Sequence, residues 1–244
     1  MPKLYFISDA HLGLGSKSEE REKELRLVEF LENIRRDASQ LFIVGDLFDA
    51  WFEYRTVIPK GFHRLFTKLE DLTRQGVTIH YLAGNHDYWI RDFFRDTLGM
   101  NTHHTAFDIT VDGKKIFIHH GDGLSGNDTG YKILKKILRS KWNIWLYSWL
   151  HPDIGIALAR STSRRSRHYT STKDYGEKDS MLVFARSKIA EGYDVVVMGH
   201  RHQPTRKEVG NGIYINLGDW ITHNTYAEFH GGQITLKYWN PAHQ

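Results

Sequence analysis

Short apolar runs rich in β-forming residues alternate with longer segments along most of the chain. The longer segments predict helices at 19–36, 59–75 and 178–191, and the first two carry apolar residues at three- and four-residue intervals. The short runs predict strands at 4–8, 41–44, 78–83, 115–119, 194–198, 213–217, 226–229 and 234–239. Alternating strands and helices are typical of the α/β class, so we expect residues 1–244 to form a single α/β domain.

One stretch, residues 126–178, interrupts the alternation because no part of it has the pattern of a strand. It contains Trp142, Trp145, Tyr147 and Trp149 among basic residues, followed by a polar run. We expect a mostly helical cap here, inserted between two strands of the domain. Its aromatic and basic side chains suit a membrane interface or a lipid-binding cleft. Packing of the tryptophans against the core is an equally open alternative.

Basic residues are concentrated in the same stretch. The whole chain has 33 Lys and Arg against 29 Asp and Glu, yet nine basic residues and a single acid, Asp153, lie between residues 131 and 168. The remainder of the chain is slightly acidic. This local positive charge indicates an anionic partner, such as phosphate, nucleic acid or an acidic membrane.

Two absences from the sequence limit the chemistry and the location. The chain has no cysteine, which excludes disulfides and thiolate catalysis and leaves nitrogen and oxygen atoms to hold any metal. It also has no run of eighteen apolar residues, so no bilayer span is expected. Because the first residues lack the pattern of a signal peptide, we expect a cytoplasmic protein.

Polar motifs follow five of the predicted strands at the point where each strand ends. They are Asp9-Ala10-His11, Gly45-Asp46, Gly84-Asn85-His86-Asp87, His120-Gly121-Asp122 and Gly199-His200-Arg201-His202. Ligands of open α/β sheets bind beyond the carboxyl ends of the strands, so we expect these side chains to converge. Each motif alone is weakly specific. Five of them in order, each closing a strand, form a strong signal.

The convergent side chains predict a site for two metal ions. Two cations roughly 3.5–4 Å apart need a bridging carboxylate, and Asp46 is suited to that role. At the end of the fourth of these strands, side-chain alternation directs one of His119 and His120 away from the site, and we expect His120 to point inward. The predicted ligands are Asp9, His11, Asp46, Asn85, His120, His200 and His202.

These motifs, in this order, resemble those of the calcineurin-like metallophosphoesterases. The resemblance implies a four-layer α/β/β/α sandwich, with one metal held by Asp9, His11, Asp46 and His202 and the other by Asp46, Asn85, His120 and His200. It also implies that a hydroxide bridging the metals is the nucleophile. His86 is then the catalytic side chain that faces the phosphate, protonating the leaving oxygen or stabilising its charge. Asp87 or Asp49 is expected to orient its ring.

A closer resemblance rests on Gly45–Trp51, His120–Leu124, the helical insertion and Asn216–Ile221, which look like the corresponding parts of the UDP-2,3-diacylglucosamine diphosphatases of lipid A synthesis. It implies hydrolysis of the pyrophosphate of UDP-2,3-diacylglucosamine to UMP and 2,3-diacylglucosamine 1-phosphate. It further implies two divalent ions, with manganese expected, and peripheral association with the inner membrane. The implied substrate contacts are Asn85, His86, Asp128, Arg164, Arg165, Ser171 and Lys178.

Other functions stay open at this point. In the best-known branch of these diphosphatases an arginine stands in the place of His86, whereas histidine is the general residue of phosphoesterases. A soluble phosphodiesterase or phosphatase acting on a nucleotide or another phosphoester is therefore the alternative. A third possibility is a non-catalytic module that binds nucleic acid through 160–167. The intact set of ligands argues against it, and nucleic acid is not the expected partner; the sequence does not indicate an oligomeric state.

Overall fold

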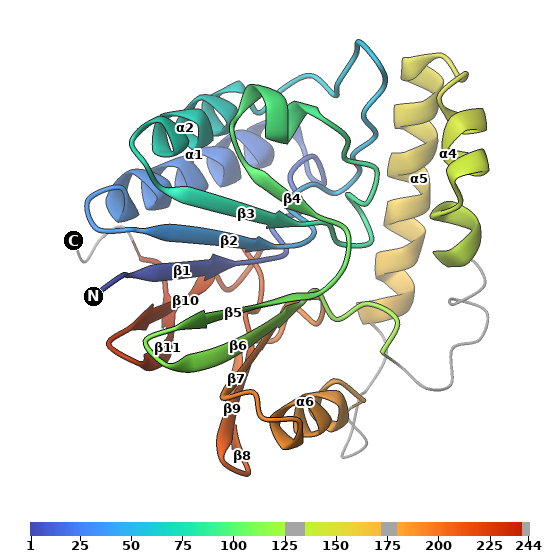
Figure 1. Cartoon of the computed structure of the whole chain (residues 1–244). Helices are drawn as coiled ribbons and strands as arrows, with labels where there is room; N and C mark the ends of the chain where they lie inside the picture. The colour runs from blue at the N-terminus through green and yellow to red at the C-terminus, as the bar shows by residue number, and fades with distance from the viewer. Residues whose placement is uncertain (125–134, 172–179, 241–244) are drawn as a thin grey trace.

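The computed structural model describes residues 1–124, 135–171 and 180–240, with only the backbone described for 164–171. Two sheets lie face to face (Figure 1), one with the strand order β11-β10-β1-β2-β3-β4 and the other with the order β5-β6-β7-β9-β8. The first contains β1 (Leu4–Ile7), β2 (Gln40–Val44), β3 (Thr78–Leu82), β4 (Asn101–His103), β10 (Thr225–His230) and β11 (Gln233–Tyr238). The second contains β5 (Phe107–Val111), β6 (Lys114–His119), β7 (Val195–Met198), β8 (Thr205–Val209) and β9 (Gly212–Asn216).

Helices cover the outer faces of both sheets. The first sheet is covered by α1 (Lys17–Ile34) and α2 (His63–Arg74), and α6 (Ser180–Ala190) packs on the second (Figure 1). A short π-helical turn, η1 (Phe93–Thr97), leads into β4. The four-layer α/β/β/α expectation is therefore confirmed. The three predicted helices begin and end within four residues of the observed bounds of α1, α2 and α6.

Side-chain alternation along the strands separates the core into layers. Tyr5 and Ile7 of β1 join the cluster beneath α1 and α2, while Leu4 and Phe6 face the second sheet. Phe6 stacks on Phe42 of β2 with 4.7 Å between the ring centroids. Because both faces of β1 are buried, its sequence is continuously apolar, as expected for a strand in a parallel sheet covered on both sides.

Local signals set several element boundaries. α1 begins at a capping box, in which the Ser16 side chain accepts from the Glu19 backbone and the Glu19 carboxylate accepts from the Ser16 backbone. After α2 the chain turns at Gly76, whose φ of +92° is a conformation that favours glycine and ends the helix. A tight hairpin at Gly231-Gly232 joins β10 to β11, since His230 pairs with Gln233 across it.

Three strands, β4, β5 and β8, were not predicted from the sequence. β4 is only three residues long, and β8 is an edge strand of mainly polar, exposed residues, so no apolar run marks these two strands. In β5 the alternate residues Phe107, Ile109 and Val111 are partly buried and pack against the core between the sheets, a period-two pattern that the prediction missed.

The expected helical content of the insertion is present in its described part, as α4 (Lys141–Tyr147) and α5 (Pro152–Ser171). Both helices lie beyond the C-terminal ends of β1 and β2 (Figure 1). Within the described residues, none of the helices combines the length and apolar character needed to cross a bilayer.

Candidate metal centre

The five strand-end motifs meet at one edge of the sandwich. The loops after β1, β2 and β3 come from the first sheet, and those after β6 and β7 come from the second. Within each sheet these strands run parallel to one another. The motif loops also bond to one another, as Asp9 N donates to Gly45 O at 3.1 Å and Gly199 N donates to His120 O at 2.9 Å. The seven predicted ligands converge because the two sheets are stacked.

One half of the centre is formed by Asp9, His11 and His202, whose ligand atoms all lie within 4.8 Å of one another. The Nε2 atom of His202 lies 3.3 Å from Asp9 Oδ1, and His11 Nε2 lies 3.7 Å from the same oxygen. Asp9 is fully buried, and its Oδ1 accepts no hydrogen bond from any described residue. A buried carboxylate oxygen without a hydrogen bond, facing two imidazole nitrogens, fits a divalent cation.

The other half is formed by Asp46, His120 and His200. Asp46 Oδ2 lies 3.2 Å from His120 Nε2, and Asn85 Oδ1 lies 3.2 Å from the same nitrogen. Asp46 Oδ2 also lies 3.7 Å from His11 Nε2 in the first half. Asp46 is thus placed between the two groups, where a carboxylate could bridge two ions.

The backbone around the centre is conformationally unusual. Five predicted ligands have positive φ angles of 42° to 71°, a region that residues other than glycine seldom adopt; they are Asp9, His11, Asp46, His200 and His202. Strained backbone of this kind clusters at functional sites. The sharp turns direct the side chains of a single short loop toward the same point.

Hydrogen bonds fix the orientation of several ligands. The Nδ1 atom of His120 lies 2.9 Å from Val44 O and donates to it, which leaves Nε2 for the centre. Asp9 Oδ2 accepts from His200 N at 2.8 Å, which leaves Oδ1 to face His11 and His202. Asp46 Oδ1 likewise accepts from His86 N at 2.9 Å.

Close packing also fixes the position of Asp46. A Cβ at Gly84 would meet Asp46 Oδ1 at 2.1 Å, so only glycine fits there. The carboxylate of Asp87 accepts from Leu47 N and Gly84 N, both at 2.7 Å. Asp87 therefore holds the Asp46 loop, because backbone amides occupy its oxygens, and of the two residues expected to orient His86 it leaves Asp49 for that role.

The charges in the centre favour bound cations. Burial disfavours charge on His120, but Asp46 outweighs this and raises the pKa of His120 to about 10. His200, further from the carboxylates, has its pKa lowered to about 4 by burial and by the nearby His120. The buried carboxylates thus stabilise positive charge at this point of the structure.

His86 lies beside these groups, and its ring centroid is 4.7 Å from that of His11. One of its nitrogens lies within 4.8 Å of ligand atoms of His11 and Asp46. Its Nδ1 atom contacts Asp49 O at 3.0 Å and Ser163 Oγ at 2.9 Å. Asp49 thus orients the ring through its main-chain oxygen. Ser163, on α5, was not predicted, since an isolated serine in a polar helical run carries no local signal.

The remaining predicted residues are placed as follows. Asp128 and Lys178 lie outside the described residues, while Arg164, Arg165 and Ser171 lie on the last turns of α5, where only the backbone is described. His119 points away from the centre, with its ring 5.7 Å from that of Phe184 on α6. Asp122 forms ion pairs with Lys135 and Arg139 at 2.6 and 2.9 Å and so ties the start of the insertion to the β6 loop.

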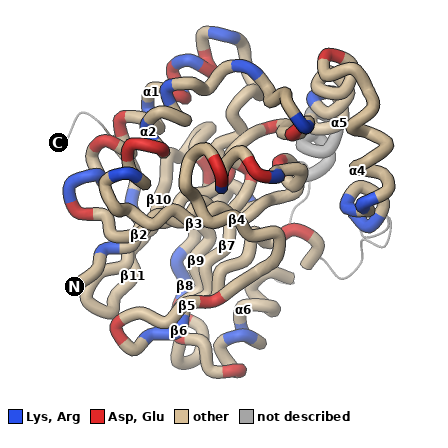
Figure 2. The backbone as a smooth tube through the Cα atoms, turned by 45° about the horizontal axis from the view of Figure 1, so that its top comes forward, with Lys and Arg blue, Asp and Glu red and all other residues tan. Residues whose placement is uncertain are grey.

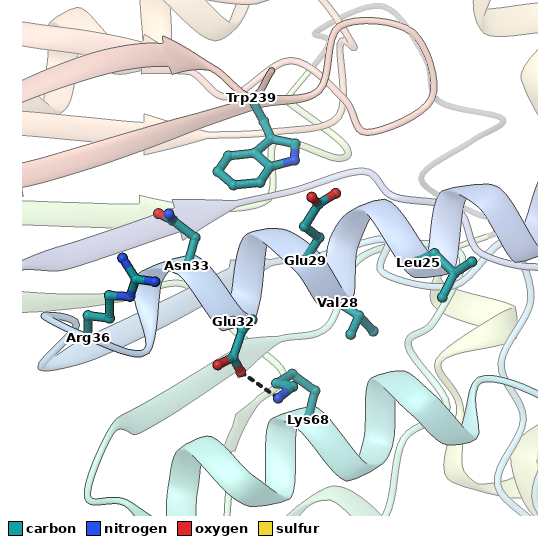
Figure 3. Close-up of a pocket in the computed structure, with 8 residues that line it drawn as sticks. All are labelled: Leu25, Val28, Glu29, Glu32, Asn33, Arg36, Lys68 and Trp239. Atoms are coloured by element: carbon teal, nitrogen blue, oxygen red, sulfur yellow. Dashed lines mark hydrogen bonds and ion pairs between the residues drawn. The ribbon is translucent and has the colours of Figure 1, made fainter. Parts of the chain in front are cut away.

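A groove of about 560 Å³ lies elsewhere, on the exposed side of α1 near Trp239 and the Glu32–Lys68 ion pair (Figure 3). None of the predicted site residues lines it, and its charged groups have mixed sign. It therefore does not compete with the metal centre as the candidate site.

Comparisons with known proteins agree with this geometry. The family model described as calcineurin-like phosphoesterase matches residues 2–204. A Porphyromonas gingivalis protein named UDP-2,3-diacylglucosamine hydrolase is 33% identical, over 96% of this chain and 97% of its own. A Haemophilus influenzae protein with the same name is 29% identical, over 90% and 91%. The solved structure of an archaeal phosphodiesterase matches with a TM-score of 0.50 at 14% identity, over 97% of this chain and 99% of that one, which supports the fold alone.

Proposed function

Because the chain belongs to the calcineurin-like phosphoesterase family, we propose that it hydrolyses the pyrophosphate bond of UDP-2,3-diacylglucosamine. Water is added across the bond, and the products are UMP and 2,3-diacylglucosamine 1-phosphate. The chain is a hydrolase of phosphoester or pyrophosphate bonds. The observation that carries the choice of substrate is the extent of the similarity, since relatives named for this substrate match 96% and 90% of the chain, insertion included.

The donor set fits two divalent ions, for which we propose manganese. Asp9, His11 and His202 would hold one ion, and Asn85, His120 and His200 the other, with Asp46 shared between them; these assignments rest on the proximity of their ligand atoms. When bound, such ions supply a hydroxide nucleophile near neutral pH and neutralise charge on the phosphate.

His86 is the proposed catalytic side chain. Asp49 O can only accept a hydrogen bond, so the Nδ1 atom of His86 carries the proton of that contact. The Nε2 atom is then free to face the phosphate. In the imidazolium form, which carries a proton on both nitrogens, His86 would donate its Nε2 proton to the leaving oxygen as the bond from phosphorus to that oxygen breaks, or would stabilise the charge of that oxygen through a hydrogen bond.

The residues 126–178 are proposed to form a cap that binds the lipid part of the substrate. Trp142 and Trp145 on α4 and Trp149 just after it are exposed, with 74%, 51% and 75% of each accessible to solvent, so these three tryptophans do not pack on the core, whereas Tyr147 contacts Phe52. Ile154 and Leu158 extend this apolar face onto α5. Basic residues lie at one end of α4 (Figure 2).

Such a surface favours peripheral binding to an anionic membrane, where the acyl chains of the substrate reside. Proposed contacts with the diphosphate or lipid are Arg164 and Arg165, and proposed contacts with the rest of the substrate are Asn85, His86, Asp128, Ser171 and Lys178. No contact with nucleic acid is proposed.

The substrate assignment is tested with the manganese-loaded protein and detergent-solubilised UDP-2,3-diacylglucosamine, with UMP release followed by chromatography. A parallel panel contains cyclic nucleotides, UDP-sugars without acyl chains and nitrophenyl phosphoesters, and Asp46→Ala protein measures the background. We expect turnover of the acylated substrate to exceed that of the panel. Turnover of the panel alone would refute the lipid substrate and favour the second candidate, a soluble phosphodiesterase or phosphatase, which the presence of His86 supports.

A further inference from the structure

Ser163 is the buried side chain through which the insertion reaches the catalytic histidine. It lies on α5, 77 positions from His86 in the sequence, yet its Oγ atom is 2.9 Å from the Nδ1 atom of that ring. The same hydroxyl lies 2.8 Å from Asp49 Oδ1. Ser163 is 6% exposed and Asp49 is 2% exposed, so both contacts are shielded from water.

The contacts among the three groups are consistent with one pattern of donors and acceptors. The Asp49 carboxylate is an acceptor, so the Ser163 hydroxyl donates its single proton to Oδ1. The lone pairs of Oγ are then available to accept the Nδ1 proton of His86, which is shared with Asp49 O. Asp49 Oδ1 also lies 3.5 Å from His11 Nδ1, behind a predicted metal ligand.

The way α5 rests on the enzyme explains how a serine reaches this point. Gly155, Ala159 and Ser163 lie at four-residue intervals on one face of the helix. A Cβ at Gly155 would meet the Tyr54 hydroxyl at 2.0 Å, so the helix approaches the core closely there. The Tyr147 hydroxyl donates to Gly155 O at 2.6 Å and ties α4 to the same turn. These contacts at Gly155 fix the position of α5 about two helical turns before Ser163.

We propose that Ser163 is a positioning residue for His86, which fixes the ring with Nδ1 as the donor and Nε2 turned to the leaving group. Rapid hydrolysis therefore requires α5 to be correctly packed against the core, so that Ser163 reaches His86. The inference rests on the proposed role of His86 but not on the identity of the lipid substrate. Synthetic phosphodiesters can therefore test it, whatever the natural substrate is.

The test compares Ser163→Ala, Ser163→Thr and His86→Ala with the unaltered protein, all loaded with manganese. The matched control is Ser161→Ala, which removes an exposed hydroxyl from the same helix. Hydrolysis of bis(4-nitrophenyl) phosphate, with a good leaving group, is compared with that of diphenyl phosphate, with a poorer one. Metal content and the melting temperature of each variant are measured alongside.

For Ser163→Ala we expect kcat on the phenyl ester to fall about tenfold, as for the loss of one strong hydrogen bond in the transition state, with a smaller fall on the nitrophenyl ester. KM and metal content should stay unchanged. Ser163→Thr, which keeps the hydroxyl, should recover most of the rate, and His86→Ala should show the same leaving-group dependence with a larger loss.

Equal losses of Ser163→Ala on both esters, or no loss, would overturn the inference while leaving the role of His86 intact. If His86→Ala itself shows no dependence on the leaving group, both the inference and the proposed role of His86 fail. The hydrolysis of UDP-2,3-diacylglucosamine is measured separately, so failure of that substrate is distinguishable from either result.

Discussion

The Nε2 atoms of His11 and His202 lie 3.2 Å apart, although 191 positions separate the two residues in the chain. Both atoms also face the buried Oδ1 of Asp9, which accepts no hydrogen bond within the described part of the chain. Two imidazole nitrogens and a carboxylate oxygen directed at one point form a donor set that suits a divalent cation. The arrangement is therefore explained best as one half of a metal centre.

Manganese should accordingly stabilise the fold. At about 100 times the Kd of the ion, the gain in free energy of unfolding is about 2.7 kcal/mol, which corresponds to a rise in Tm of about 5–10 °C for a chain of this size. Differential scanning calorimetry with added Mn²⁺ or EDTA measures it. His11→Ala should lose most of the rise and His63→Ala, an exposed histidine on α2, should keep it. Equal rises in both variants would contradict the assignment.

Asp46 and His86 should differ in their effect on metal content. Asp46 lies in both halves of the centre, so Asp46→Ala should abolish activity and lower the bound metal from two ions per chain. His86→Ala should retain the metal but lower kcat by about 10²–10⁴-fold, as for loss of a proton donor. Elemental analysis and steady-state kinetics of the same preparations check this. Loss of metal from His86→Ala to the same degree would show that His86 is a ligand.

The exposed tryptophans on and just after α4 should determine membrane binding. Replacing Trp142 or Trp149 by Asp removes a large apolar side chain from the proposed interface and adds a charge that anionic lipid repels. We expect each change to weaken binding to phosphatidylglycerol vesicles about tenfold or more in a sedimentation assay. Tyr238→Asp alters an aromatic residue of similar exposure on β11 and should leave binding unchanged. A similar loss in all three variants would argue against a specific α4 face.

A pair of histidines on the neighbouring strands β3 and β4 should make stability depend on pH. The Nδ1 atom of His80 lies 3.1 Å from His103 Nε2. Burial, together with His103, lowers the pKa of His80 to about 4, and burial also lowers the pKa of His103. The unfolded chain therefore binds protons more readily below about pH 6.5, and this contribution to stability is lost as the pH falls from 6.5 toward 4.

Urea unfolding of the metal-free protein between pH 4 and 8 measures the effect. His80→Phe preserves an aromatic ring next to Phe42, which the His80 ring now stacks on at 4.8 Å. This variant should have a flatter pH profile than the unaltered protein. His63→Phe, which changes an exposed histidine, should not alter the profile. Parallel profiles for all three proteins would show that His80 is not responsible.

The sequence by itself determined the strand ends and the side chains that follow them. Asp9, Asp46, Asn85 and His200 were predicted because apolar runs and the glycines that end them are local signals, read within a few residues. The alternation that sends His119 outward and His120 inward is equally local. The α/β class and the order of the motifs followed from the same kind of evidence.

Only the tertiary structure decided how the two sheets bring those ends together and which residues support them. Ser163 reaches His86 because α5 packs closely at Gly155 against Tyr54, a contact between segments about 100 positions apart. Asp87 turned out to hold the Asp46 loop for the same reason, since its backbone partners come from two different loops. Such contacts depend on the relative placement of packed elements, and no local pattern of residues specifies that placement.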